Sequence, residues 1–439
     1  MAEVLAAPPA RQRRWRIDAR TLAVAILLAV AAVAIIGRVG PRGADARQSL
    51  VDALTTLDAG NFSAARNHAQ AAVRAAPDSG MAHAILARAY LQLGEGLAAE
   101  SELARAREAG MPEVRLHQLA AHAAFLQGDD AGAIAQAARA APRYANYAGR
   151  IEARARAAQG ATTTAVASLE RLTARNPGDA AAWTDLGRVR LSAGDIGGAT
   201  VASARAVALA PRDPVALTLR GEVVRTRLGL IAALPWFEAA LRRDAYYHPA
   251  LIEYAATLGD AGRYREMLAA TRRAQAARPG SPQAFYLQAV LAARANRLDL
   301  ARDLLGRTGG VLDDLPGAVL LSGSLDLAQG KNEQAIAMYR RVVDLQPLNV
   351  GARRLLGVAL LRSGDPAGAR ATLAPIATRS DADAYALTVA ARAFEAGGDR
   401  EGAAILLDRV ARASGAPAAV FASDTAVAAV AAGAARAPD

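Results

Sequence analysis

The side chains best suited to chemistry in this sequence are cations that recur at a nearly constant interval. Steps of about 34 residues separate four of them, which are Arg88, His122, Arg154 and Arg188. Guanidinium groups bind carboxylates and other oxyanions through charge-assisted hydrogen bonds. If these side chains share one surface, they offer anion binding, and an acidic peptide, a C-terminal carboxylate or an anionic polysaccharide would fit. The alternative is that the arginines only solvate an alanine-rich surface.

Patterns that mark catalytic or metal sites do not occur. The chain has no cysteine, which excludes disulfides, thiolate zinc sites, iron–sulfur clusters and cysteine nucleophiles. Gly330-Lys331 lacks the upstream glycine of a phosphate-binding loop, and no serine sits in a nucleophile elbow. His83 and His117 are one such step apart, with His122 close to the second, and we interpret them as packing residues. We therefore expect a non-catalytic protein without a metal or cofactor.

Composition favours helices. Hydrophobic residues make up 53% of the chain and aromatic residues only 4%, and alanine has the highest helix propensity. The formal net charge is +11, but the arginines are spread along the chain and do not form the basic stripe of a nucleic-acid interface. We expect no nucleic-acid partner.

Prolines reveal the elements that must position these cations. Pro177, Pro211, Pro279 and Pro347 are separated by one, two and two periods of about 34 residues, a period typical of helix–turn–helix repeats. In this register eleven units tile residues 46–417, and they begin at residues 46, 80, 114, 146, 180, 214, 248, 282, 316, 350 and 384. The third unit is shorter than the others by two positions. The two helices of each unit must then bury their apolar faces against neighbouring units.

Fixed positions within the units support this register. The eighth position is Ala or Gly in all eleven units, as at Gly187 and Gly323, and the twentieth is Ala in ten, as at Ala199 and Ala335. Small side chains at these positions allow two helices to approach closely. The fifteenth position is Gly in nine units and Asn in a tenth, which predicts a turn with a left-handed residue.

These positions identify a resemblance. Residues 180–211, with Gly187, Ala199 and Pro211, and residues 316–347, with Gly323, Ala335 and Pro347, resemble the tetratricopeptide repeat family. The resemblance implies an all-α, right-handed α-solenoid of about eleven repeats that binds protein partners. It also implies that the first helix of each unit lines the concave face, which would bring together six cations: Arg88, Arg115, His122, Arg150, Arg154 and Arg188. We expect residues 418–439 to form a capping helix and a frayed tail.

The N-terminus predicts a membrane anchor. Residues 21–36 contain no charge, and with Gly37 they could span a bilayer as a short helix. A cleaved signal peptide is the alternative, although no clean cleavage site follows the run. Five arginines precede the run, so the positive-inside rule places the basic residues 1–20 in the cytoplasm. Residues 38–45 would then be a linker, and the repeats would lie in the periplasm of a bacterium with two membranes.

These features together predict a single-pass inner-membrane scaffold for protein–protein interaction. Proteins that look like this often support an envelope assembly process such as exopolysaccharide synthesis or export. Two alternatives remain open, a cytoplasm-facing membrane-bound regulatory adaptor and a repeat factor of the cytochrome c maturation type. The aromatic residues Tyr246, Tyr247 and Tyr264 mark the junction of the later units, where we interpret them as core packing.

Overall fold

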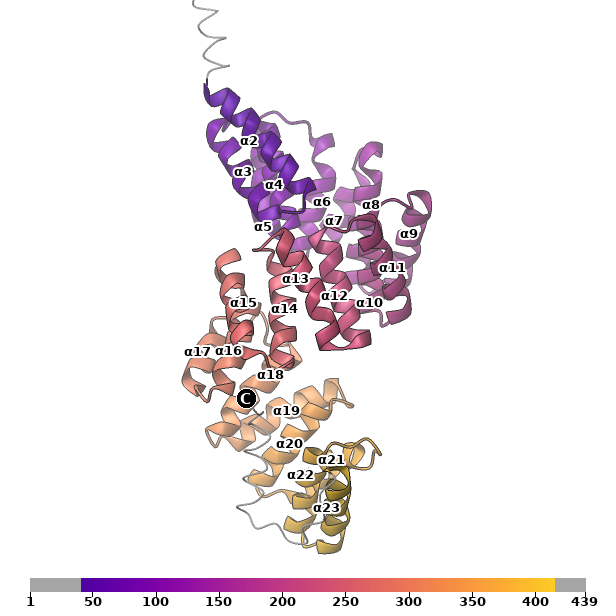
Figure 1. Ribbon diagram of the computed structural model, residues 1–439, viewed down its shortest axis with the longest axis vertical. Coiled ribbons are helices and arrows are strands. Elements are labelled where there is room, and N and C mark those ends of the chain that lie inside the picture. The colour runs from indigo at the N-terminus through magenta and orange to yellow at the C-terminus, as the bar shows by residue number, and fades with distance from the viewer. Residues whose placement is uncertain (1–40, 415–439) are drawn as a thin grey trace, which may run out of the picture. The chain divides into compact units, whose positions relative to one another are not determined.

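The computed structural model describes residues 41–414, which form α-helices, two short 3₁₀ helices and turns, with no strand among them (Figure 1). Over these residues, twenty-two α-helices form eleven consecutive antiparallel pairs. The first helices of the pairs are α2 (Pro41–Asp58), α4 (Gly80–Gln92), α6 (His117–Leu126), α8 (Ala145–Ala158), α10 (Ala180–Ser192), α12 (Pro214–Leu228), α14 (His248–Asp260), α16 (Pro282–Arg294), α18 (Pro316–Ala328), α20 (Val350–Arg362) and α22 (Ala384–Ala396).

The second helix of each pair follows after a short turn. These helices are α3 (Phe62–Ala75), α5 (Gly96–Glu108), α7 (Asp130–Ala138), α9 (Thr162–Arg175), α11 (Ile196–Leu209), α13 (Leu230–Arg243), α15 (Tyr264–Ala277), α17 (Leu298–Gly306), α19 (Asn332–Leu345), α21 (Pro366–Ala377) and α23 (Arg400–Ser414). The prediction of an all-helical repeat solenoid is therefore confirmed over residues 41–414. The helices group into two compact units, which we call the first unit (residues 41–253) and the second unit (residues 254–414).

The turns within the pairs have the chemistry that the sequence predicts. The turn glycines adopt positive φ angles, such as 79° at Gly194, and Asn296 takes the same conformation with φ 55°. An aspartate directly after the glycine then caps the next helix: the Asp195 carboxylate accepts a hydrogen bond from the Gly198 N–H at 2.8 Å. At the pair with leucine in the fifteenth position, Gly229 supplies the left-handed residue with φ 93°.

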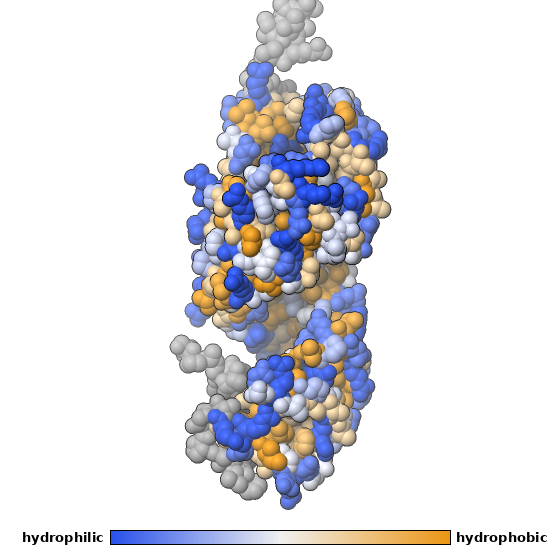
Figure 2. Space-filling view, turned by 90° about the vertical axis from the view of Figure 1, so that its right-hand side faces the viewer, coloured by the Kyte–Doolittle hydropathy of each residue, from blue (hydrophilic) through white to orange (hydrophobic). Residues whose placement is uncertain are grey.

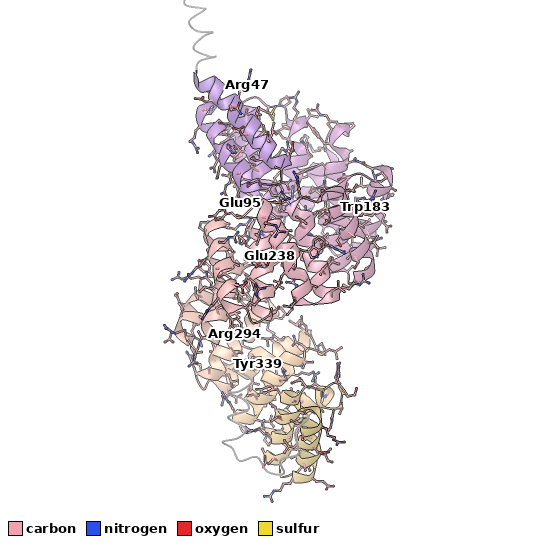
Figure 3. All side chains as sticks on the ribbon, viewed as in Figure 1. Arg47, Glu95, Trp183, Glu238, Arg294 and Tyr339 are labelled. Carbon is pink, nitrogen blue, oxygen red and sulfur yellow. The ribbon has the colours of Figure 1, made fainter. Side chains whose placement is uncertain are left out.

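Close packing inside each pair depends on the small eighth and twentieth positions. Ala199 and Ala335 are fully buried, as their register predicts. At Gly323 a Cβ atom would lie 2.7 Å from the ring of Tyr339, which is itself fully buried between α18 and α19 (Figure 3). A large side chain on the second helix thus fills the space that the missing Cβ leaves on the first.

The third pair is the most irregular, and it has the shortest repeat. A 3₁₀ turn, η1 (Glu113–Arg115), precedes α6, and a second, η2 (Pro142–Tyr144), follows α7. The helix therefore begins at His117, later than the start that the register predicts. Arg115 lies in the exposed η1 turn, outside the helix on which the concave row was expected.

Within the first unit the chain returns to its own first pair. The backbone N–H of Ser63, at the start of α3, donates a 2.8 Å hydrogen bond to the carboxylate of Asp244, which is buried at the end of α13. The rings of Phe62 and Tyr247 meet edge to face at 5.7 Å. We call these four residues the clasp. Because the clasp joins segments 181 residues apart, it closes the curve of helices α2 to α13.

Surface side chains of mixed polarity cover the rest of the described helices. Large apolar side chains such as Leu97 and Leu348 are strongly exposed, at 70% and 80%. On the face shown in Figure 2, apolar residues alternate with charged ones. Scattered apolar residues are normal on a protein surface. This pattern contrasts with the interior of the first unit, where polar groups of several helices converge.

Three predicted segments lie outside the described residues: the basic segment 1–20, the membrane-spanning segment 21–37 and the capping segment 418–439. Among residues 41–414, none of the helices combines the length and the apolar character that crossing a membrane requires. The first pair begins earlier than its register suggests, because α2 starts at Pro41 and includes residues that were expected to form the linker.

Candidate functional site

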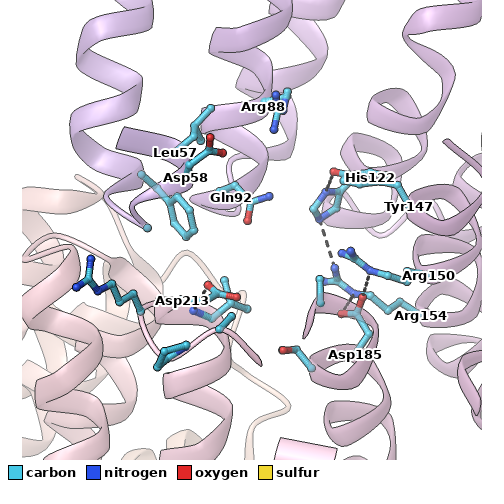
Figure 4. Close-up of a pocket in the computed structure, with 18 residues that line it drawn as sticks. Leu57, Asp58, Arg88, Gln92, His122, Tyr147, Arg150, Arg154, Asp185 and Asp213 are labelled. Atoms are coloured by element: carbon cyan, nitrogen blue, oxygen red, sulfur yellow. Dashed lines mark hydrogen bonds and ion pairs between the residues drawn. The ribbon is translucent and has the colours of Figure 1, made fainter. Parts of the chain in front are cut away.

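A chamber of about 410 Å³ opens inside the first unit, between the clasp and the first helices of four successive pairs (Figure 4). Helices α4, α6, α8 and α10 contribute six of its polar side chains: Arg88, His122, Tyr147, Arg150, Arg154 and Asp185. The end of α2, the start of α3 and the turn before α12 supply further wall residues, including Asp58, Phe62 and Asp213. Segments far apart in the sequence therefore line one partly open cavity, into which these polar groups project among apolar ones.

The strongest interaction in the chamber is an ion pair between α8 and α10. Arg150 donates through Nε to Oδ2 of Asp185 at 2.8 Å, and both side chains are largely buried, with 14% and 8% of their surface exposed. Arg150 Nη1 also lies 3.8 Å from Asp179. Burial by itself would lower the pKa of Arg150, but the charge of Asp185 and its hydrogen bond outweigh burial and raise it. This arginine therefore holds neighbouring repeats together as well as lining the chamber.

Arg154 joins the same carboxylate to a histidine. Its Nε lies 3.7 Å from Asp185 Oδ1, and its guanidinium stacks 4.4 Å from the ring centroid of Phe125. Its Nη1 lies 3.4 Å from His122 Nε2, and the other ring nitrogen of His122 lies 2.7 Å from the hydroxyl of Tyr147. Burial, followed by the charges of Arg154 and Arg150, lowers the pKa of His122 well below its ordinary value, so the ring is neutral at pH 7.

The structure brings together four of the six residues named for the cationic row. Arg88, His122, Arg150 and Arg154 line one chamber, but Arg115 in η1 and Arg188 are not part of its wall. Arg188 instead lies 4.0 Å from Glu222 of the next pair. Carboxylates of the following helix face Arg150, Arg154 and Arg188, so most of the charge in this row is paired within the chain. Whether these residues bind a partner stays a prediction.

Two important groups escaped the sequence reasoning. Asp185 is acidic, and the row predicted from the sequence contains only basic residues. Tyr147 lies on the first helix of its repeat, three residues before Arg150, so it shares the face predicted for the cationic row. The position of Tyr147 in its repeat could have identified it. Any polar residue on the predicted concave face, and not only a basic one, is a candidate binding residue.

The histidines interpreted as packing residues are hydrogen-bonded within the first unit. His83 is buried between α4 and α5, where its nitrogens lie 2.6 Å from Glu102 and 2.8 Å from the carbonyl oxygen of Pro77. His117 lies 2.9 Å from the side-chain oxygen of Gln136. In the described part of the chain no three His, Asp or Glu side chains are arranged as metal ligands.

A comparison with known protein families identifies the type of repeat in three segments of the chain. A family model described as tetratricopeptide repeat matches residues 50–114, 152–214 and 320–384. Tetratricopeptide repeats are therefore present in these three segments. The resemblance read from the spacing is therefore confirmed in these three segments, and the helical pairs between them have the same organisation.

Several solved structures are similar to the chain. A chain in the crystal structure of the APC/C hetero-tetramer Cut9–Hcn1 has a TM-score of 0.57 at 14% identity, with 84% of each chain covered. PilW, a type IV pilus biogenesis factor, has a TM-score of 0.40 at 19% identity, covering 48% of this chain and 98% of PilW. A tetratricopeptide repeat protein from Parabacteroides merdae has a TM-score of 0.39 at 16% identity, covering 57% and 96%. No curated protein matches the sequence. The first likeness supports the helical-repeat fold and carries no information about function.

Proposed function

We propose that this chain is a non-catalytic scaffold that binds a protein partner through the chamber of its first unit. Side chains from four successive repeats converge there, and most of them hold one another in place. One does not: Arg88 lines the chamber, yet it makes no hydrogen bond or ion pair with any residue of the described chain. A guanidinium carries five N–H donors. Arg88 is exposed to solvent, and its unused donors, beside the paired charges of Arg150, Arg154 and Asp185, are the observation that supports binding of an external group.

The ion pairs of the chamber have a structural role, and they do not by themselves indicate catalysis. Arg150, Arg154 and Asp185 contact each other across two repeats and so stiffen the concave surface. A rigid, preorganised surface loses less conformational entropy when a partner binds. Repeat solenoids present such surfaces to extended partners.

Site-specific photo-crosslinking in living cells tests this function. A photoreactive amino acid at Gln92, which lines the chamber, should capture a partner, whereas the same amino acid at the exposed Thr163 on α9 should not. Arg88→Glu should reduce capture at Gln92 without lowering the amount of folded protein, since Arg88 has no partner to lose. Equal capture at both positions, or capture that Arg88→Glu leaves unchanged, would overturn a partner site in the chamber.

We further propose that residues 21–37 anchor the scaffold in the inner membrane and that the repeats act in the periplasm, in an envelope assembly process such as exopolysaccharide synthesis or export. The uncharged run and the five arginines before it support this placement. Alkaline phosphatase fused after Asp439 should be active, and a fluorescent protein that matures only in the cytoplasm should stay dark. The opposite result would favour a cytoplasm-facing regulatory adaptor.

A further inference from the structure

Hydrogen bonding in the chamber determines the tautomer of His122. The guanidinium of Arg154 has only donors, so His122 Nε2, 3.4 Å away, must offer its lone pair. The lowered pKa of this histidine agrees with a neutral ring. The single ring hydrogen is then on Nδ1, and it is donated to the hydroxyl oxygen of Tyr147 at 2.7 Å. Arg154 therefore sets which way the hydrogen bond between the histidine and the tyrosine runs.

This direction leaves the hydroxyl hydrogen of Tyr147 unused. Its oxygen accepts from His122, and no acceptor for its own O–H lies among the described residues. Burial raises the pKa of Tyr147, and the nearby arginines only partly oppose that effect, so the hydroxyl stays protonated. Tyr147 lines the chamber together with Arg88, whose N–H donors are also unused (Figure 4). The chamber thus offers an O–H donor and a guanidinium to an incoming acceptor.

Charge balance limits what that acceptor can be. The chamber wall carries four arginines, Arg88, Arg150, Arg154 and Arg212, and three aspartates, Asp58, Asp185 and Asp213, while His122 is neutral. The wall therefore has a net charge of one positive unit. A carboxylate brings one negative charge, which matches it. A phosphate monoester brings about −1.5 to −2, and the excess would face the three aspartates.

We propose that the chamber binds a single carboxylate, received by the guanidinium of Arg88 and the hydroxyl of Tyr147. The volume of about 410 Å³ falls in the range of small-ligand sites and leaves room for a carboxylate on a short carbon chain. Two sources share this chemistry, a free small carboxylic acid and an acidic side chain of a bound polypeptide. The inference rests on the chamber being the binding site, as proposed above, and adds the chemical class of what enters it.

Binding measured by calorimetry on the full-length protein in detergent tests the carboxylate site. The probes are butyrate, a peptide capped at both ends that contains one Glu, the same peptide with Gln, and inorganic phosphate. Butyrate or the Glu peptide should bind. If butyrate binds at least tenfold more tightly, the source is a free carboxylic acid; if the Glu peptide does, the source is an acidic side chain of a polypeptide. The Gln peptide and phosphate should bind at least tenfold more weakly. Carboxylate probes that fail to bind, or phosphate that binds more tightly, would overturn the proposal.

Two variants test the named donors. Tyr147→Phe removes only the hydroxyl, and a hydrogen bond to a charged group contributes enough that affinity should fall about 10-fold or more. Arg88→Gln should weaken binding by a similar factor and cannot break an internal pair. Tyr144→Phe, in η2 and outside the chamber wall, is the matched control and should bind like the wild type. Unchanged affinity in both Tyr147→Phe and Arg88→Gln sinks the proposal.

Crosslinking separates this inference from the proposed function. If Tyr147→Phe and Arg88→Gln abolish both carboxylate binding and capture at Gln92, the carboxylate belongs to the partner interaction. If capture at Gln92 persists while the probes never bind, the scaffold function stands and the carboxylate assignment is wrong.

Discussion

The first helices of the two units use the same repeat position in opposite ways. In three successive repeats of the first unit the ninth position carries Arg88, His122 and Arg154, and in three successive repeats of the second unit it carries Val290, Ser324 and Val358. Arg154 and His122 lie in neighbouring repeats and meet each other at 3.4 Å. Ser324 instead accepts a 3.1 Å hydrogen bond from Tyr339, the tyrosine of its own repeat. The polar residues Arg154 and His122 at this position therefore link two repeats of the first unit, whereas Ser324 makes a hydrogen bond within its own repeat in the second unit.

This difference teaches that the repeat register decides where a side chain lies, and the neighbouring repeat decides what it does. Long arginines reach carboxylates on the next helix and bind the repeats together. A serine cannot reach that far, so the stability of its repeat depends on how well large and small residues match inside the pair. At the ninth position and its contacts, the first unit should be sensitive to loss of charge pairs, and the second to changes in volume.

The largest effect is expected from the central ion pair of the first unit. Arg150→Leu leaves the buried carboxylate of Asp185 with only the longer contact to Arg154. We expect a loss of about 3 kcal/mol in the free energy of unfolding, because one buried charge remains uncompensated. Urea unfolding followed by circular dichroism measures it. Arg150→Leu combined with Asp185→Leu should lose less than the single variant, and Arg307→Leu, from an exposed pair in the second unit, should lose about 0.5 kcal/mol or less. Equal losses for all three would remove the contrast between the units.

The next effect tests the closure of the first unit. Asp244→Ala removes the acceptor for two backbone N–H groups, those of Ser63 at 2.8 Å and Tyr246 at 3.0 Å. The Ser63 N–H is buried, so we expect a loss of about 2 kcal/mol and faster amide exchange in α3. Hydrogen–deuterium exchange measures it. Asp195→Ala, which removes a helix cap of the same unit, should change exchange only near α11. Exchange in α3 that does not respond to Asp244→Ala would show that the clasp contributes nothing.

A volume change tests the second unit. Gly323→Ala forces a Cβ to within 2.7 Å of the Tyr339 ring, which has no exposed surface and no room to move. We expect the free energy of unfolding to fall by about 1–3 kcal/mol. Gly306→Ala, at the end of α17 in the same unit, meets no atom within 4 Å and should be neutral or slightly stabilising. Thermal unfolding of both variants decides the matter, and similar melting temperatures would refute size matching at this position.

The smallest effect is a pH dependence that belongs to the first unit. The folded-state pKa of His122 is lowered from 6.5, so the unfolded chain takes up a proton that the folded chain refuses. The stability that the neutral His122 ring contributes is fully present above about pH 6.5, and it is lost as the pH falls towards the folded-state pKa of His122. His122→Gln lacks this term, so the stability advantage of the wild type should shrink between pH 7 and pH 5. Unfolding curves at several pH values measure it, and a constant or growing advantage would contradict the burial of a neutral ring.

Sequence alone determined the repeated part of this protein. The proline period, the turn glycines and the small eighth position predict the eleven pairs, because a helix, its cap and its turn depend on residues only a few positions apart. Asp195 and Asn296 behave as their local chemistry demands. Arg115 does not, because the shortened third repeat puts a 3₁₀ turn where a helix was expected.

Only the tertiary structure decided the chamber. Arg150 and Asp185 are 35 residues apart and Ser63 and Asp244 are 181 apart, so their meeting depends on how the repeats turn relative to one another. Each repeat contributes a small rotation, and those rotations add up over six pairs before the clasp can form. No single residue encodes that sum. The sequence could therefore name arginines that would share a face, but not which carboxylates would neutralise them or that Arg88 and Tyr147 would keep their donors free.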